Sequence, residues 1–161
     1  MHFVLLLVLS CFSMAHALNF EQLNDQGLKI QRGTIRTVSS TEVQADYRVS
    51  FPGTPSQNIT VRALALQKNH QIQKLQVLKL QNLPSSQGEK VFNAVLRMAS
   101  LCLNFGPSAA SMDHMMQAAQ NSNLNFSKTY GSVKVAYQIQ QGKLLSLSYQ
   151  RLKTQPSSCT L

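Results

Sequence analysis

The sequence predicts an α+β fold, in which a mainly antiparallel sheet of five to six strands carries an αα-hairpin packed on one face. Three patterns lead to this prediction. Residues 42–51 alternate apolar and polar side chains, residues 86–119 repeat apolar residues at helical spacing, and residues 133–149 form two alternating runs around a glycine. Strands and helices that occur in separate blocks favour hairpins over parallel βαβ units, so the expected order is (α)βββ(β)ααββ.

The N-terminal residues have the pattern of a secretory signal peptide. An apolar stretch at residues 3–9 precedes the small-residue sequence Ala15-His16-Ala17, so we expect cleavage after Ala17. The apolar stretch is far shorter than the ~20 residues that cross a bilayer. A second interpretation treats residues 8–11 as a lipoprotein cleavage box in which Cys11 is lipidated. We therefore expect a periplasmic or secreted protein, with a membrane-anchored lipoprotein as the alternative.

The rest of the chain is expected to form a single α+β domain at residues 18–155, followed by a C-terminal tail at residues 156–161, after the signal peptide at residues 1–17. No second apolar run is present, so no transmembrane segment is expected in the mature chain. Fifteen Lys and Arg residues against six Asp and Glu residues give a formal charge of +9. This balance favours anionic partners.

Two cysteines, Cys102 and Cys159, remain after removal of the leader. An even pair in an exported protein indicates a disulfide bond between them. The alternative is one buried thiol and one free thiol in the tail.

The first elements after the leader are a short helix and a half-buried strand. Asn19 could cap a helix that ends near Gly27. From Glu42 to Phe51 the odd-numbered residues are apolar and form the buried face of a strand. Residues 52–56 contain two prolines and a glycine, which indicates a loop.

Two further strands are expected at residues 58–67 and 71–81, joined through residues 68–70. In their centres, apolar side chains occur at both odd and even positions. Such strands are typical of the middle of a sheet that is covered on both faces.

The two helices follow. Ser86 and Glu89 form a capping box before a helix that ends at Gly106 and Pro107. Ser108 can cap the second helix. The expected inner face of the second helix consists of Met112, Met115, Met116 and Ala119.

The last two strands should form a hairpin closed by a three-residue loop, Gln140-Gln141-Gly142, with Gly142 in the left-handed conformation. A two-residue loop would place Tyr137 opposite Ser146 and mix buried and exposed faces. The expected pairs are Tyr137 with Leu145, Val135 with Leu147, and Val133 with Tyr149.

Motifs of catalysis are absent from the sequence. It contains no HExxH, CxxC or GxSxG sequence, and Asp113 and His114 are helix neighbours that diverge by ~100°. We therefore expect no catalytic, cofactor-binding or metal-binding residues, and a hydrolase using His70 or His114 is the weaker hypothesis. Asn58 and Asn125 each begin an N-glycosylation sequon, which matters only in a eukaryotic secretory pathway.

Nucleic acid is not the expected partner. Proteins that bind single strands combine basic grooves with exposed aromatic platforms. Tyr47, Tyr137 and Tyr149 fall on the apolar faces of the predicted strands, so they are expected in the core.

Three segments, NITVRALALQKNHQIQKLQVLKLQNLP, KVFNAVLRMASLCLNFGPSAA and YGSVKVAYQIQQGKLLSLSYQRLK, carry a resemblance to a known family. They resemble small periplasmic proteins of Gram-negative bacteria that are classified as a domain of unknown function. The resemblance covers about residues 58–153 and implies an exported envelope protein. It transfers no activity and no catalytic residues.

The sequence therefore predicts an exported, non-enzymatic periplasmic binding or accessory protein with an anionic envelope component or an acidic protein as partner. An inhibitor or immunity-type protein that blocks a secreted enzyme is the alternative. The expected partner surface consists of Lys68, His70, Gln73 and Lys74.

Overall fold

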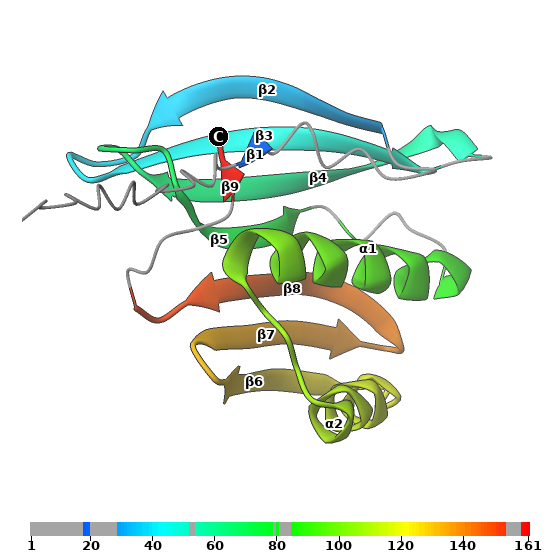
Figure 1. The fold of residues 1–161 in the computed structure, drawn as a ribbon. Coiled ribbons are helices and arrows are strands. Elements are labelled where there is room, and N and C mark those ends of the chain that lie inside the picture. Colours follow the sequence, from blue (N-terminus) through cyan, green and yellow to red (C-terminus); the bar gives the residue numbers. More distant parts are fainter. Residues whose placement is uncertain (1–17, 20–28, 52–53, 79, 81–84, 154–158) are drawn as a thin grey trace, which may run out of the picture.

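The computed structural model describes residues 18–19, 29–51, 54–78, 80, 85–153 and 159–161. One sheet of seven strands dominates this part of the chain, in the spatial order β2-β3-β4-β5-β8-β7-β6 (Figure 1). Every neighbouring pair in it is antiparallel. The strands are β2 (Lys29–Thr37), β3 (Glu42–Phe51), β4 (Thr54–Leu66), β5 (Ile72–Leu78), β6 (Leu124–Tyr130), β7 (Val133–Gln140) and β8 (Lys143–Arg151).

Two helices and a small second sheet complete the described fold. Helix α1 (Ser85–Leu103) lies over β5 and β8, and helix α2 (Ala109–Ala119) lies at the β6 edge (Figure 1). Strands β1 (Leu18–Asn19) and β9 (Cys159–Thr160) pair in parallel. The α+β class and the mainly antiparallel sheet are therefore confirmed, whereas the predicted strand count and order are wrong.

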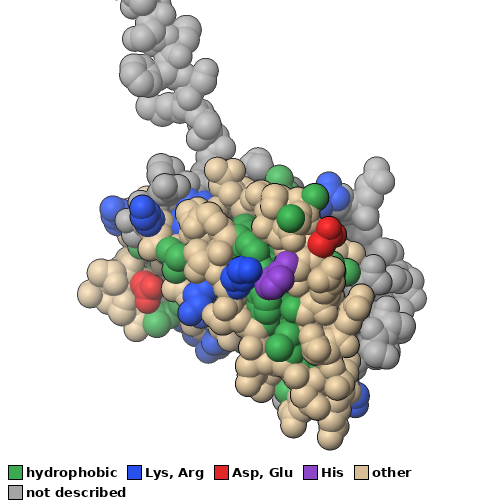
Figure 2. Space-filling view, turned by 90° about the horizontal axis from the view of Figure 1, so that it is seen from below, with side chains coloured by type: hydrophobic (Ala, Val, Ile, Leu, Met, Phe, Trp, Pro, Cys, Tyr) green, Lys and Arg blue, Asp and Glu red, His purple; other side chains and the backbone are tan. Residues whose placement is uncertain are grey.

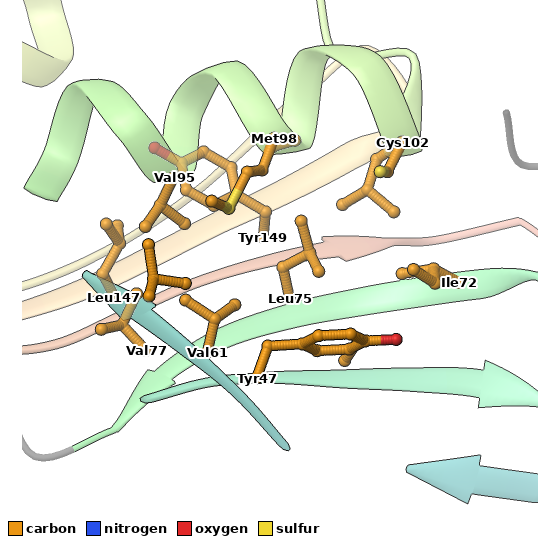
Figure 3. Close-up of a cluster of buried hydrophobic side chains, with 14 of the residues drawn as sticks. Tyr47, Val61, Ile72, Leu75, Val77, Val95, Met98, Cys102, Leu147 and Tyr149 are labelled. Atoms are coloured by element: carbon orange, nitrogen blue, oxygen red, sulfur yellow. The ribbon is translucent and has the colours of Figure 1, made fainter. Parts of the chain in front are cut away.

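The core lies between α1 and one face of the sheet. Val95, Met98 and Cys102 point from α1 toward Leu75 and Tyr149 on the central strands (Figure 3). These five side chains are at most 3% exposed. The apolar periodicity of α1 fits this contact, because residues three or four positions apart share one side of a helix. Burial of apolar surface stabilises a fold by about 25 cal/mol per Å². Burial of this stripe therefore holds α1 on the sheet.

Strand β3 confirms the predicted alternation. Val43, Ala45, Tyr47 and Val49 are buried on the helix side of the sheet. The intervening polar residues point to the other face and are half-buried or exposed. Phe51 ends the strand.

The central strands differ from the prediction in one respect. Residues Val61, Ala63, Leu75 and Val77 are buried, as expected for strands in the middle of the sheet. The apolar side chains on the opposite face, such as Leu64, are only half-buried. The prediction that both faces are covered is therefore wrong, because both described helices lie on the same face.

The two helices form at the predicted positions, but they pack on different strands rather than on each other as an αα-hairpin, because α1 lies on β5 and β8 whereas α2 lies on β6. Asn104, with a φ of 53°, follows the last residue of α1, so an asparagine and not Gly106 takes the left-handed conformation there. The Ser108 hydroxyl accepts a hydrogen bond from the Ser111 N–H and caps α2 as predicted.

The expected inner face of α2 is only partly right. Met115 is buried and Met112 is half-buried, but Met116 is 37% exposed. Helix α2 packs against the edge strand β6 rather than over the sheet centre, so only a narrow stripe of its surface is covered.

The register of the β7–β8 hairpin corrects the predicted loop. Gln140 pairs with Lys143, so the loop has two residues, Gln141 and Gly142, with φ values of 51° and 69°. Both positive values fit a type I′ turn. A register shift between Gln138 and Ile139 then brings the apolar residues of the two strands to the same side of the sheet. The resulting pairs are Tyr137 with Leu147, Val135 with Tyr149, and Val133 with Arg151.

Two edge strands were missed by sequence reasoning. Strand β2 contains few apolar residues, and a register shift between Arg32 and Ile35 interrupts its alternation. Gly33 lies at this shift, where an added Cβ would come within 2.7 Å of the Asp46 carbonyl oxygen. Strand β6 mixes Asn, Ser, Lys and Thr with three apolar residues. Edge strands are half-solvated, so their apolar signal is weak.

The predicted disulfide is present. Cys102 at the end of α1 is bonded to Cys159 in β9, across a sequence separation of 57 residues, and both cysteines are fully buried. A loop of this size contributes about 4 kcal/mol in the chain-entropy model. The bond fastens the end of the chain to α1.

Several predictions fall on residues outside the described part of the chain. These are the signal peptide with its cleavage after Ala17, the lipidation of Cys11, and most of the helix expected after Asn19. Asn19 itself belongs to β1. The loop expected at residues 52–56 is shorter than predicted, because β4 already begins at Thr54. The side chains of Ser86, Glu89 and Ala119 are likewise not described.

Candidate functional site

The face of the sheet opposite α1, here called the helix-free face, is a polar surface formed by the described strands. Side chains on this face alternate with the buried core residues along each strand. They are mostly Gln, Ser and Thr, with scattered Lys and Arg. The strand register places its central residues in rows that cross the strands.

One of these rows carries three basic residues. Arg36 pairs with Gln44, Gln44 with Leu64, Leu64 with Lys74, Lys74 with Gln150, and Gln150 with Lys134. We call Arg36, Lys74 and Lys134 the basic row. Neighbouring strands lie ~4.8 Å apart, so Arg36 and Lys74 are separated by roughly 14 Å and Lys74 and Lys134 by roughly 10 Å across the sheet.

No residue of the basic row forms a salt bridge within the described part of the chain, although Arg36 lies close enough to Asp46 to lower its pKa. Arg36 and Lys134 are exposed and Lys74 is half-buried. None of the three makes an ion pair with a described carboxylate, and the row itself contains no acid. Arg151, the only buried cation among the described residues, lies on the helix side opposite Val133 and does not add to this surface.

The adjacent row contains an internally neutralised pair. The Arg62 guanidinium donates from Nε to Asp46 Oδ1 at 2.8 Å and from Nη2 to Asp46 Oδ2 at 3.0 Å. These hydrogen bonds lower the pKa of Asp46, partial burial opposes them, and the charges of Arg62 and Arg36 lower the pKa further. The influence of Arg36 on Asp46 is consistent with its place on the same face of the sheet.

A shallow hollow of about 560 Å³ lies beside this pair. Its lining includes Asp46, Arg48, Thr60 and Arg62, together with β2 at Gly33. The register shift in β2 lies at this hollow, at the edge of the helix-free face. A donor-rich depression next to the basic row could accept an anionic group of a partner.

The structure places the residues of the predicted partner surface in two different elements. Lys68 and His70 are exposed in the β4–β5 turn, at the end of the sheet. Lys74 is on the helix-free face, and Gln73 occupies the register shift between the pairs Leu64–Lys74 and Ala65–Ile72. The four residues therefore do not form a single patch. Lys68 and His70 lie in the turn at the end of the sheet, and Gln73 and Lys74 lie in β5.

Sequence reasoning missed Arg36 and Lys134 as neighbours of Lys74. Arg36 lies in a strand that was not predicted, and Lys134 is 60 positions away in the chain. Only the order β5-β8-β7 brings Lys74 and Lys134 into one row. The alternation of residues 133–139 alone places Lys134, between Val133 and Val135, on the side opposite the apolar face.

A second polar cluster lies on the helix side of β6. His114 Nδ1 is 2.9 Å from the Tyr130 hydroxyl oxygen, and the His114 ring is 5.7 Å from that of Phe126. The Lys128 ammonium lies 5.7 Å from the centre of the Tyr130 ring. From this end of the molecule, a histidine is visible beside a basic side chain and a strip of hydrophobic groups (Figure 2).

This cluster has no arrangement of a nucleophile, a base and an orienting acid. Asp113, the nearest acid in sequence, makes no hydrogen bond or ion pair with His114, and the residues of the described ranges include no group of three metal-binding side chains. The contact between His114 and Tyr130 joins α2 to the edge strand. We therefore treat the cluster as part of the α2–β6 packing.

Comparison with protein-family models, with curated proteins and with solved structures finds no match for this chain. The description of the site thus rests on the geometry of this chain. Neither of the described helices is long and apolar enough to cross a bilayer.

Proposed function

We propose that this protein is an exported, non-enzymatic binding or accessory protein that captures an anionic envelope component or an acidic protein on its helix-free face. The observation that carries the proposal is the basic row. Three cations in one register row, with no acid among them, form a track that complements an extended anionic partner.

Export is supported by two features of the chain. The leader pattern ends with the small-residue sequence Ala15-His16-Ala17. The buried disulfide fits an oxidising compartment such as the periplasm or the cell exterior. The resemblance to small periplasmic proteins points to the same location.

The chemistry of the face favours a polyanion other than nucleic acid. Tyr47, Tyr137 and Tyr149 are at most 3% exposed and lie on the helix side, so they cannot stack on bases. The helix-free face instead offers amides, hydroxyls and spaced cations. These groups suit carboxylate or phosphate groups along a flexible chain or at a membrane surface.

The test measures binding of the purified exported protein to two probes, poly-glutamate and vesicles that contain phosphatidylglycerol. Lys74→Glu and Lys134→Glu should each weaken binding by roughly fivefold or more at low salt, because each reverses a charge in the basic row. Lys128→Glu is the matched control, since it makes the same charge change on the helix side of β6.

The relative loss of probe binding among the three variants tests the proposal. A larger loss for Lys74→Glu and Lys134→Glu than for Lys128→Glu supports the helix-free face, and equal losses contradict it. The two probes distinguish an acidic polypeptide from a lipid surface. Crosslinking in the intact envelope then identifies the partner. A captured enzyme whose complex persists at 1 M salt, where the Debye length is only ~3 Å, would favour the inhibitor hypothesis.

A further inference from the structure

The last three residues of the chain connect the disulfide to the β4–β5 turn. Cys159 is bonded to Cys102 and pairs with Leu18 in the small parallel sheet. Thr160 forms an antiparallel bridge with Gln71, directly after the turn. The Leu161 N–H donates to the His70 carbonyl oxygen at 3.0 Å. The tripeptide 159–161 thus contacts α1, β1 and the turn.

The turn itself has a conformation that needs support. His70 has a φ of 56°, in the left-handed region that residues with a Cβ rarely adopt. Its N–H donates to the Leu66 carbonyl at 2.8 Å, and the Leu66 N–H donates to the Gln71 carbonyl at 3.0 Å. The hydrogen bond from Leu161 is the contact that joins His70 to a segment outside the hairpin.

We propose that the Cys102–Cys159 disulfide, acting through residues 159–161, holds the β4–β5 turn in place, so that the redox state of this bond controls the order of the turn that presents Lys68 and His70. With the bond intact, Cys159 is fixed to α1 and the neighbouring Thr160 and Leu161 are held against the turn. Without it, no covalent bond holds the tripeptide to α1, and its remaining contacts are the two-residue β1–β9 pair, the Thr160–Gln71 bridge, the Leu161–His70 hydrogen bond and the burial of Leu161.

The functional consequence rests on the proposed binding role. Lys68 and His70 extend the basic surface at the end of the sheet that carries the basic row. An ordered turn presents both side chains in one position, which lowers the entropy cost when a partner binds. In a reducing compartment the turn would be loose, and the surface would be complete only after export and oxidation.

The redox step is a thiol–disulfide exchange. Two thiol molecules donate two electrons and two protons to the S–S bond, which yields the Cys102 and Cys159 thiols and one disulfide of the reductant. Both protein sulfurs belong to fully buried residues, so the reductant reaches them only when the tripeptide detaches from the core. Reoxidation by a disulfide of the same chemical class reverses each transfer.

The test follows amide hydrogen exchange in the full exported protein, before and after reduction with dithiothreitol and alkylation. The reporting amides are His70 and Leu66, which make the hydrogen bonds of the turn. Reduction should raise their exchange rates by roughly tenfold or more, while the amides of β7 and β8 keep their protection. The double variant Cys102→Ser and Cys159→Ser should behave in the same way without any reductant.

A second pair of variants tests the connection with the disulfide intact. Leu161→Pro removes the N–H that donates to His70, whereas Leu161→Ala keeps it. Faster exchange at His70 in Leu161→Pro than in Leu161→Ala supports the proposal. Unchanged exchange at His70 and Leu66 after reduction would overturn it, and so would a general loss of protection across the sheet.

This readout is independent of any partner. If exchange responds as expected but Lys74→Glu and Lys134→Glu leave probe binding unchanged, the proposed function fails and the connection between disulfide and turn stands. If binding depends on the basic row but exchange does not respond to reduction, only the redox connection fails.

Discussion

Arg62 holds Asp46 through two parallel hydrogen bonds across the β3–β4 pair, at distances of 2.8 and 3.0 Å. The two side chains are 31% and 32% exposed and lie directly opposite each other in the strand register. Bidentate contact of this kind is stronger than an ordinary surface ion pair. It also removes the only acid of its row from competition with an anionic partner.

Replacement of this acid tests its contribution to stability. Asp46→Asn should lower the free energy of unfolding by about 0.5–1 kcal/mol at neutral pH, as for a partly exposed pair. Because the pKa of Asp46 is lowered in the folded state, the stabilisation is present above its ordinary value of 3.8 and is lost as pH falls through the lowered value. Urea denaturation at several pH values measures both effects.

Asp113→Asn provides the control for this substitution. Asp113 is exposed on α2 and makes no ion pair with a described residue. Its replacement should therefore change stability by less than about 0.5 kcal/mol. A loss for Asp113→Asn as large as that for Asp46→Asn would mean that total charge, and not the pairing with Arg62, determines the difference.

Two buried tyrosines should respond differently to loss of their hydroxyl groups. The Tyr137 hydroxyl donates to the Met115 carbonyl at 2.9 Å, so Tyr137→Phe should cost about 1 kcal/mol of stability at pH 8. The Tyr149 hydroxyl is buried and has no hydrogen-bond partner among the described residues. Tyr149→Phe should therefore leave stability unchanged or raise it.

At alkaline pH, the folding stability of the same variants should differ from that of the wild type. Burial raises the pKa of Tyr137 from 10.0 to about 12 and also raises that of Tyr149. Their stabilisation of the folded state is present below pH 10 and is lost as pH rises toward the folded values. Each Phe variant should lose less stability than the wild type over this range in urea denaturation. An identical alkaline decline in all three proteins would contradict the assignment.

The two-residue loop of the β7–β8 hairpin gives a third prediction. Gly142→Ala should destabilise the protein by about 1 kcal/mol, because a residue with a Cβ is strained at a φ of 69°. Gln141→Asn should stabilise it by a few tenths of a kcal/mol, because Asn-Gly is the preferred sequence of a type I′ turn. The Gln141 N–H, which donates to Asn123 Oδ1, is retained in this variant.

Gly106→Ala is the matched control for the glycine. Gly106 has no positive φ, and an added Cβ would meet no atom within 4 Å. This change should be neutral or stabilising by up to about 1 kcal/mol, through the entropy of the unfolded chain. Thermal unfolding of the three variants distinguishes a two-residue loop from the three-residue loop, in which Gln141 would not need a positive φ.

The β7–β8 hairpin also shows where sequence reasoning stops. The alternation of residues 133–149 correctly predicted most of the buried faces, because side chains on a strand point to opposite sides with a period of two. Leu145 is the exception, since it is only half-buried and Leu144 packs against the core instead. The register was wrong by two residues, since a short loop combined with a register shift preserves the faces as well as a longer loop does. Periodicity cannot distinguish these two solutions.

The candidate site, like the hairpin, could be predicted only in part from the sequence. Composition alone established a basic chain, the expected partner surface already contained Lys74, and an even number of cysteines indicated the bond that is found between Cys102 and Cys159. The neighbourhood of Arg36, Lys74 and Lys134, and the contact of Leu161 with His70, came only from the tertiary structure. Local periodicity is set by residues a few positions apart, whereas these contacts depend on the order of strands and on the packing of distant segments.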